Sequence, residues 1–308
     1  MQPKLRNTLI LSAVALIVFV AVMFTERWQT KSRAAKKAAV ELKKEAPHPW
    51  IISLLPSVTE TICMLGLEEH LIGRSKYCDF PPSVTNLPAV GSYGNANIEE
   101  IARMKPDFVL MADLDTQSTI HDALAKFRIS HLGVKAMSLS DITDSVWNLA
   151  EWFDATDAAA IWLDRINDLL ESARASAPAE APKVLFCAGR DPGSLDRVYI
   201  SGKGNFYEDI VVKCGGVNAY DGGLPTPMVS AEGVMTMNPD IIVDVLVGAT
   251  EADVRKAISD WARLSSVNAV KSGNVHIMTD AWAARPGPRI GFLIEAVSRY
   301  IHDWDEKR

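Results

Sequence analysis

The sequence contains the same short unit twice, and this internal repeat constrains the fold more than any other feature. The first copy, NIEEIARMKPDFVLM, spans residues 97–111, and the second, SAEGVMTMNPDIIVD, spans residues 230–244. Each matched position in the second copy lies 133 residues after its counterpart in the first. The matched pairs are Glu99 with Glu232, Ile101 with Val234, Met104 with Met237, Pro106 with Pro239, Asp107 with Asp240 and Val109 with Ile242. Self-similarity at this spacing predicts two related lobes built to one plan.

Each copy of the unit predicts a helix followed by a strand. Asn97 can cap a helix of about two turns, Pro106 ends it, and the apolar residues 107–112 favour a strand. The flanking sequence repeats as well, because the apolar stretches 50–56 and 183–189 lie at the same spacing. Strands that alternate with helices indicate a parallel sheet covered on both faces. We therefore expect an α/β fold with two similar lobes, each containing a parallel sheet.

A long amphipathic helix is predicted between the lobes. Apolar residues recur at helical spacing over residues 156–178, with Thr156 as the expected cap and Pro178 as the stop. About 22 residues give roughly 33 Å of helix, which predicts a stiff connection. The expected body therefore consists of an N-terminal lobe at 50–150, a bridging helix at 151–180 and a C-terminal lobe at 181–308.

One further helix start is suggested by the segment SVTE. Ser57 and Glu60 have the spacing of a capping box, in which the serine side chain and the glutamate each bond to the other's backbone amide. Gly66 is the expected end of that helix.

The N-terminal end is apolar and then basic. Residues 8–25 carry no charge, and at about 1.5 Å per residue they barely span a hydrocarbon core of ~30 Å. The end of this stretch is bulky and lacks a small-residue cleavage site. Residues 1–25 are predicted to be a signal-anchor, with a cleaved signal peptide as the alternative. Residues 26–49 are polar and rich in Ala and Lys, which favours a spacer next to a membrane.

The distribution of charge is uneven along the chain. The net charge is −6, while residues 1–25 carry +2 and residues 26–48 carry +4, which leaves −12 on residues 49–308. The excess of basic residues after the apolar stretch opposes export under the positive-inside rule, although long domains often cross regardless. An acidic body argues against nucleic acid as a partner, since phosphate contacts need clustered Lys and Arg.

Catalytic and metal-binding motifs are absent from the sequence. There is no G-x-S-x-G or G-x-x-x-x-G-K-[ST] motif, and the six histidines show no metal-binding spacing on a helix. The glycine-rich segment 201–205 could hold an anion, but a plain turn into a helix explains it equally. The four cysteines form no C-x-x-C pair, so buried thiols and one or two disulfides both remain open. We expect no enzymatic activity, no cofactor and no protein-bound metal ion.

Six stretches follow one another over residues 50–290 in a characteristic order. They are IISLLPSVTETICMLG, YCDFPP, VGSYGNANIEEIARMKPDFVLM, YISGKGNFYEDIVVKCGGVNAY, VSAEGVMTMNPDIIVDV and ARPGPRI. In this order the chain resembles the helical-backbone periplasmic substrate-binding proteins of ABC importers for cobalamin, ferric siderophores and haem. The segment YCDFPP makes the cobalamin-binding branch the most similar. The resemblance implies two α/β lobes joined by one long helix, in agreement with the pattern above.

The resemblance implies a docking role for the two repeated glutamates. Glu99 and Glu232 match the acidic residues with which the family docks on arginines of the membrane permease. One carboxylate per lobe offers a symmetric contact to a permease with two like subunits. The alternative is that a glutamate in the first turn of a helix is favoured by the helix dipole alone.

The resemblance also implies aromatic ligand contacts in the cleft between the lobes. Tyr77, Tyr93 and Tyr199 match ligand-binding aromatics of the family, and flat rings provide large contact areas for a flat macrocycle. Thr226 departs from the family pattern, because the cobalamin branch carries Trp there. Trp282 is a candidate replacement ring.

Two polar residues near Trp282 complete the candidate ligand site. Asp280 is a further pocket residue, and Arg285 could pair with carboxylate or phosphate groups of a ligand. Arg289, four residues later, could equally form a structural ion pair.

The expected protein is therefore the binding component of an ABC importer on the extracytoplasmic face of the membrane. Its partners would be an ABC permease and its ATPase, and its cargo a metal chelate, with cobalamin or another corrinoid first and a ferric siderophore or haem next. A membrane-tethered ligand sensor or scaffold with the same fold is the alternative. The choice of chelate, cleavage of the N-terminal segment, the cysteine redox state and the oligomeric state remain open.

Overall fold

The structure, a computed structural model, describes residues 49–92, 94–113 and 118–307. Trp50–Arg308 forms one compact unit, separate from Met1–Pro49. The predicted signal-anchor at 1–25 lies outside the described residues, as does nearly all of the spacer at 26–49. Among the helices that are described, none is long and apolar enough to cross a membrane.

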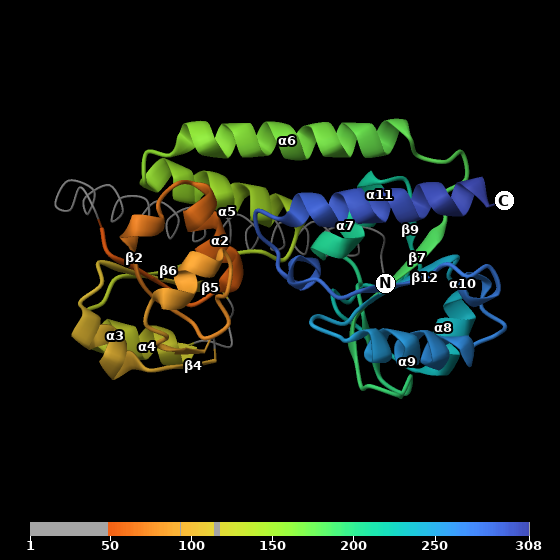
Figure 1. Cartoon of the computed structure of the whole chain (residues 1–308), viewed down its shortest axis with the longest axis horizontal. Coiled ribbons are helices and arrows are strands. Elements are labelled where there is room, and N and C mark those ends of the chain that lie inside the picture. The colour runs from red at the N-terminus through yellow and green to blue at the C-terminus, as the bar shows by residue number, and fades with distance from the viewer. Residues whose placement is uncertain (1–48, 93, 114–117, 308) are drawn as a thin grey trace, which may run out of the picture. The chain divides into compact units, whose positions relative to one another are not determined.

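The first lobe runs from β1 to α5 and has helices on both faces of its sheet (Figure 1). Its strands are β1 (Ile51–Ser53), β2 (Leu71–Arg74), β3 (Gly91–Ser92), β4 (Asn95–Ala96), β5 (Phe108–Ala112) and β6 (His131–Val134). Its helices are α2 (Pro56–Met64), α3 (Ile98–Met104), α4 (Ser118–Lys126) and α5 (Leu139–Trp152), with short 3₁₀ turns at Glu68–His70 and Pro82–Asn86.

The second lobe runs from β7 to α11 and repeats this plan with additions. Its strands are β7 (Lys183–Arg190), β8 (Val198–Ile200), β9 (Val217–Asn218), β10 (Met228–Val229), β11 (Ile241–Val245) and β12 (Val275–Met278). Its helices are α7 (Phe206–Lys213), α8 (Ala231–Met237), α9 (Glu251–Ala262), α10 (Asn268–Lys271) and α11 (Ile290–Glu306), with a 3₁₀ turn at Ala281–Ala284.

The prediction of parallel sheets is confirmed for the first lobe and only partly right for the second. The order β2-β1-β5-β6 is parallel throughout. In the second sheet, β7, β9, β11 and β12 are parallel, but β8 runs in the opposite direction and pairs antiparallel with both β7 and β10. The short connection between β7 and β8 explains this difference, since a parallel return needs a crossover of a dozen or more residues. Gly193, at φ 83°, lies in that connection.

Helix α6 (Thr156–Ala175) joins the two lobes, as the sequence predicts. It runs along both lobes and packs on α5 of the first and α11 of the second (Figure 1). Trp162 is buried in this contact, and its indole Nε1 donates to the carbonyl of Pro288 at 2.8 Å. The packing fixes the bridge on both sides, which supports the expectation of a stiff connection.

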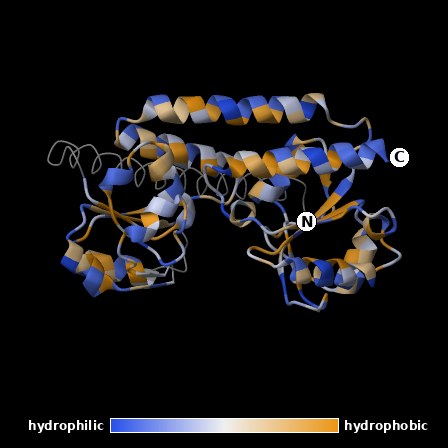
Figure 2. Cartoon of the chain, in the orientation of Figure 1, coloured by the Kyte–Doolittle hydropathy of each residue, from blue (hydrophilic) through white to orange (hydrophobic). Residues whose placement is uncertain are grey.

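One hydrophobic core extends through both lobes and the bridge. It contains buried side chains of α2, α5, α6, α7 and α11 together with those of β1, β7 and β11. Two smaller clusters cover the other face of each sheet, under α3 and α4 in the first lobe and under α8 and α9 in the second. Figure 2 shows the apolar strands between helices whose two faces differ in hydropathy.

Two predicted helix caps are wrong. Helix α2 begins at Pro56, with Leu55 as its N-cap and no side-chain capping bond, because proline suits the first turn of a helix. Ser57 and Glu60 therefore form no capping box. Thr156 is the first residue of α6 rather than its cap, because the turn after α5 places Ala155 at the N-cap position.

Candidate functional site

Helices α3 and α8, the repeated helices, begin in the same way. The side chain of Asn97 accepts a hydrogen bond from the amide of Glu100 at 3.1 Å, which confirms the predicted cap. The hydroxyl of Ser230 accepts from the amide of Gly233 at 3.4 Å. Each cap satisfies one of the free N–H groups at a helix start, so both helices hold their first turn in a fixed orientation.

Glu99 and Glu232 occupy the same place in these first turns, two residues after the cap. Both are exposed. A hydrogen bond with Ser230 lowers the pKa of Glu232, which keeps that carboxylate charged. No described residue forms an ion pair with either glutamate, so both carboxylates are open to an external cation.

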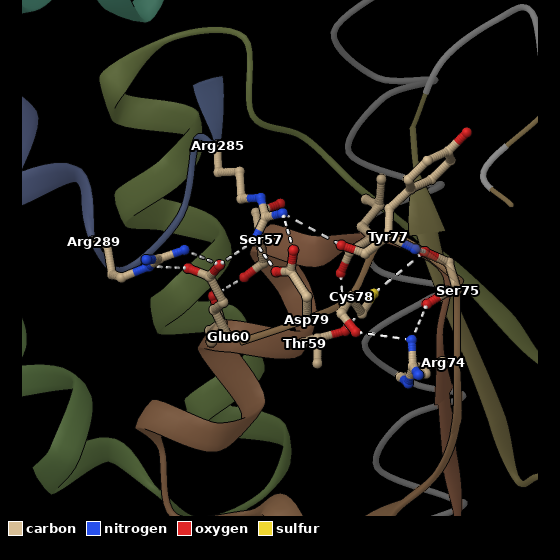
Figure 3. Close-up of polar contacts among 12 residues, drawn as sticks. Ser57, Thr59, Glu60, Arg74, Ser75, Tyr77, Cys78, Asp79, Arg285 and Arg289 are labelled. Carbon is tan, nitrogen blue, oxygen red and sulfur yellow. Dashed lines mark hydrogen bonds and ion pairs between the residues drawn. The ribbon is translucent and has the colours of Figure 1, made fainter. Parts of the chain in front are cut away.

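A network of ion pairs connects the two lobes (Figure 3). Arg289 donates to Glu60 from Nε at 2.8 Å and from Nη2 at 2.6 Å. Arg285 donates to Asp79 at 2.5 and 3.0 Å and to Glu60 at 3.2 Å. A longer contact of 3.4 Å joins Arg285 to the carbonyl of Tyr77. Two arginines from the segment before α11 thus hold α2 and the loop after β2.

The network is buried on the side of Glu60 and open on the side of Asp79. The Glu60 side chain is 2% exposed, whereas that of Asp79 is 58% exposed. Hydrogen bonds from Arg285 lower the pKa of Asp79 below its usual value. The Arg289 guanidinium also stacks over the ring of Phe80, 4.0 Å from its centre. Asp79 is the member of this network that solvent or a ligand can reach.

Among the aromatic candidates for ligand contact, Tyr77 and Tyr199 are accessible. Tyr77 is 55% exposed, and its ring points away from the ion pairs (Figure 3). Lys76 lies over that ring at 5.0 Å from its centre. Tyr199, in β8 of the second lobe, is 42% exposed. Tyr93 lies outside the described residues.

The other candidates have different surroundings. Asp280 is exposed, at the start of the turn after β12. Trp282, in that turn, is half-buried and packs against Phe292 with ring centres 5.9 Å apart. Arg285 is engaged by Asp79 and Glu60, so its donors face protein carboxylates rather than an open cleft.

Glu60 and Asp79 were missed by the sequence analysis as site residues. Their arginine partners lie more than 200 positions away in the chain. Glu60 was assigned to a local cap that does not form. The one available signal was that ARPGPRI carries two arginines, whose charge needs compensation if the segment is buried.

Among the cavities lined by described residues, one of about 760 Å³ lies between α6 and α7, and two others are also large enough for small molecules. One, of about 440 Å³, is lined by α2, α6 and the start of α11, and includes Phe80, Trp162 and Phe292. The other, of about 460 Å³, lies in the second lobe at the carboxyl ends of β7 and β11. Ligands of open α/β sheets bind at such strand ends.

The four cysteines are free and form no disulfide. Burial raises the pKa of the Cys63 and Cys214 thiols to about 12, and it also raises that of Cys187. These three thiols are therefore protonated at neutral pH and are poor nucleophiles. Cys78 is buried and contacts the hydroxyls of Thr59 and Ser75.

The glycine-rich segment 201–205 forms a turn into α7. Asn205 caps the helix by accepting from the amide of Tyr207 at 2.9 Å, and the amide of Gly204 donates to Glu208 at 2.6 Å. Across the described ranges, no group of three or more His, Cys, Asp or Glu residues is arranged to hold a metal ion.

The body thus consists of two α/β lobes on one packed helix, with accessible aromatic rings on both lobes. Over residues 51–281 the chain matches the family described as periplasmic binding protein, and it belongs to that family.

Relatives and solved structures agree with this assignment. The vitamin B12-binding protein of Salmonella choleraesuis (strain SC-B67) is 27% identical over 244 residues, which cover 79% of this chain and 86% of that protein. The structure of the periplasmic vitamin B12 binding protein BtuF of Vibrio cholerae is similar with a TM-score of 0.72 at 24% identity, covering 84% of this chain and 98% of that one. The periplasmic heme binding protein HutB of Vibrio cholerae gives 0.69 at 19% identity, covering 82% and 98%. At these identities the structural matches show the shared fold.

Proposed function

We propose that this chain is the substrate-binding component of an ABC importer that takes a metal chelate into the cleft between its lobes. Cobalamin or another corrinoid is the first candidate cargo, and a ferric siderophore or haem is the next. The names of the relatives support this order, since the vitamin B12-binding protein of Salmonella choleraesuis is similar over most of both chains.

The observation that carries the proposal is the matched pair of exposed glutamates. Glu99 and Glu232 have equivalent positions in α3 and α8, and neither is needed to cap its helix, since Asn97 and Ser230 do that. An exposed carboxylate on each lobe suits two arginines of a two-subunit permease. No reaction is catalysed in this proposal, because the ATPase of the importer would drive release of the cargo.

The proposed ligand contacts are the accessible rings of Tyr77 and Tyr199, with Tyr93, Trp282 and Asp280 alongside. Arg285 enters the proposal with a changed role. Its ion pairs with Asp79 support a positioning function, in which it holds the loop that carries Tyr77. A ligand carboxylate or phosphate would compete with Asp79 for Arg285.

The domain organisation and location follow from the same proposal. An N-terminal anchor at 1–25 and a spacer at 26–49 would tether the body, made of lobes at 50–150 and 181–308, to the extracytoplasmic face of the membrane. Tethering raises the effective concentration of the binding protein near its permease.

A fluorescence titration tests the proposal. The purified full chain is titrated with cobalamin, haemin and ferric hydroxamate and catecholate siderophores, and quenching of tryptophan emission is followed. Saturable quenching by one of these chelates identifies the cargo. We expect Tyr77→Ala to weaken that binding by about 1–3 kcal/mol, as for the loss of a stacked ring.

The matched control for Tyr77 is Phe127, which is 52% exposed and also lies in the first lobe. Phe127→Ala should leave the affinity unchanged. Equal losses in both variants would move the ligand site away from Tyr77. If no chelate gives a saturable response, the cargo assignment fails, and a membrane-tethered sensor or scaffold becomes the better-supported function.

A further inference from the structure

Two histidines that are separate in the sequence come together in the first lobe. His121 lies in α4, and His131 is the first residue of β6, ten positions later. Their ring centres are 4.9 Å apart, and the ring planes are inclined by 56°. Both side chains are half-buried. They belong to neither the candidate ligand residues nor the candidate docking residues.

The distance between the rings suits a shared metal ion. Imidazole nitrogens bind Zn²⁺ at about 2.0–2.1 Å, and two ligands at angles between 90° and tetrahedral then have ring centres roughly 4.5–5 Å apart. The observed separation of 4.9 Å falls in this range. Simple packing of two rings also occurs at this distance, so the ring nitrogens must decide between the two interpretations.

The hydrogen bonding of both rings leaves nitrogen atoms available. Nδ1 of His131 lies 3.1 Å from the carbonyl oxygen of Ile129. Because a carbonyl only accepts, Nδ1 carries the proton and Nε2 has a free lone pair. A metal-binding histidine is typically oriented by such a bond from its other nitrogen. Neither nitrogen of His121 bonds to any residue that the structure describes.

The surroundings of the pair favour a cation. The carboxylates of Asp113 and Asp122 lie within electrostatic range of His121. Lys135 lies 4.0 Å from Asp113 and partly offsets the charge of that carboxylate.

We propose that His121 and His131 together bind one divalent transition-metal ion of the class that prefers imidazole, such as Zn²⁺, Ni²⁺ or Cu²⁺. Water completes the coordination, because the described part of the chain offers no third protein ligand in place. The bound ion joins helix α4 to β6, which is an edge strand of the first sheet. Occupancy therefore stabilises the first lobe against unfolding.

Copper binding to the purified full chain tests this proposal at neutral pH. Electron paramagnetic resonance of one equivalent of Cu²⁺ reports how many imidazole nitrogens coordinate the ion. We expect two, together with a rise in Tm on addition of Zn²⁺. A spectrum with one imidazole or none overturns the proposal, and this measurement needs no variant that has to fold.

Variants then assign the ligands. His121→Ala and His131→Ala should each weaken Cu²⁺ binding by at least about tenfold and abolish the Zn²⁺-dependent rise in Tm. The matched control is His302→Ala, since His302 is an exposed histidine that pairs with Glu306 in α11. Binding that is unchanged in the first two variants, or lost in the control, overturns the assignment.

Discussion

Asp107 and Asp240, at equivalent positions of the repeat, fasten the first strand of their own lobe in the same way. The Asp107 carboxylate accepts from the amide of Trp50 at 2.7 Å, and the Asp240 carboxylate accepts from the amide of Lys183 at 2.9 Å. Each aspartate amide also donates to the carbonyl of the same partner, at 2.9 and 2.8 Å. In each lobe the Pro-Asp pair therefore holds the start of the first strand, β1 or β7, beside the strand that comes directly after the pair.

Removing either clamp should destabilise the lobe that contains it. We expect Asp107→Ala to lower the free energy of unfolding by about 1 kcal/mol through the lost hydrogen bond. Asp240→Ala should cost more, because Oδ1 of Asp240 also accepts from Asn268 at 3.0 Å. Urea denaturation measures both changes. The double variant should show their sum within about 0.5 kcal/mol, since the clamps share no partner, and a large deviation would show that the lobes are coupled.

The buried carboxylate of Glu60 makes Arg289 important for stability. Arg289→Ala would leave Glu60, whose side chain is 2% exposed, with Arg285 as its remaining cationic partner. Since a buried carboxylate that loses its two shortest charged hydrogen bonds is costly, we expect a loss of about 3 kcal/mol in the free energy of unfolding.

Two controls make the Arg289 measurement specific. Arg103 pairs with Glu100 on the surface, and its side chain is 75% exposed. Arg103→Ala should lower the free energy of unfolding by less than about 0.5 kcal/mol. Adding Glu60→Gln to Arg289→Ala should restore part of the loss by removing the buried charge. No recovery in that double variant would mean that packing, rather than charge, dominates.

His276 should make the protein less stable under mildly acidic conditions. Burial lowers the pKa of His276 to about 4, with Lys307 contributing further, while its ring stacks on Tyr300 at 3.8 Å. A pKa below the unfolded value of 6.5 means that protonation favours the unfolded chain. Its contribution is therefore complete above pH 6.5 and is lost as the pH falls from 6.5 through 4. The loss should be roughly 2 kcal/mol, allowing for partial exposure.

His276→Phe isolates this effect, because phenylalanine keeps the stack on Tyr300 and cannot titrate. The difference in unfolding free energy between the unmodified protein and the variant, measured at several pH values from 7 to 4, should decline with falling pH. Parallel curves for the two proteins would contradict the assignment to His276.

Docking through the two glutamates predicts a separation of transport from binding. Glu99→Ala combined with Glu232→Ala should abolish uptake of the cargo, while the affinity for the chelate stays unchanged, because both side chains are exposed in α3 and α8. The comparison is uptake in cells against fluorescence titration of the purified protein.

The control for docking is Glu251, an exposed glutamate in the first turn of α9. Glu251→Ala should leave uptake intact. Normal uptake in the double variant of Glu99 and Glu232 would rule out the docking role.

The secondary structure was largely predictable because its signals are local. The Asn97 cap and the long apolar stripe of α6 each depend on neighbouring residues, and the structure confirms them. The caps assigned to Ser57 and Thr156 were wrong because Pro56 and the turn at Ala155 decide those helix starts instead.

The interlobe contacts could not be predicted, since sequence separation carries no information about which charges meet. Glu60 finds Arg289 across 229 positions, and Asp79 finds Arg285 across 206. The sequence predicted no strand at Val198–Ile200, so the antiparallel pairing of β8 with β7 was missed as well. Of the site residues, the exposure of Tyr77 and Tyr199 is seen in the structure, and their role in binding stays a prediction.

The likeness of α3 and α8 creates an ambiguity of orientation. A two-fold symmetric partner that touched only Glu99 and Glu232 could receive this protein in two ways, related by half a turn, and could not tell one from the other. The residues next to the two glutamates differ between α3 and α8, and this difference removes the ambiguity. Where α3 presents the ion pair of Glu100 and Arg103, α8 presents Gly233 and Thr236. A partner that also contacts those positions would bind this protein in a single orientation, with each lobe over a defined side of the pore.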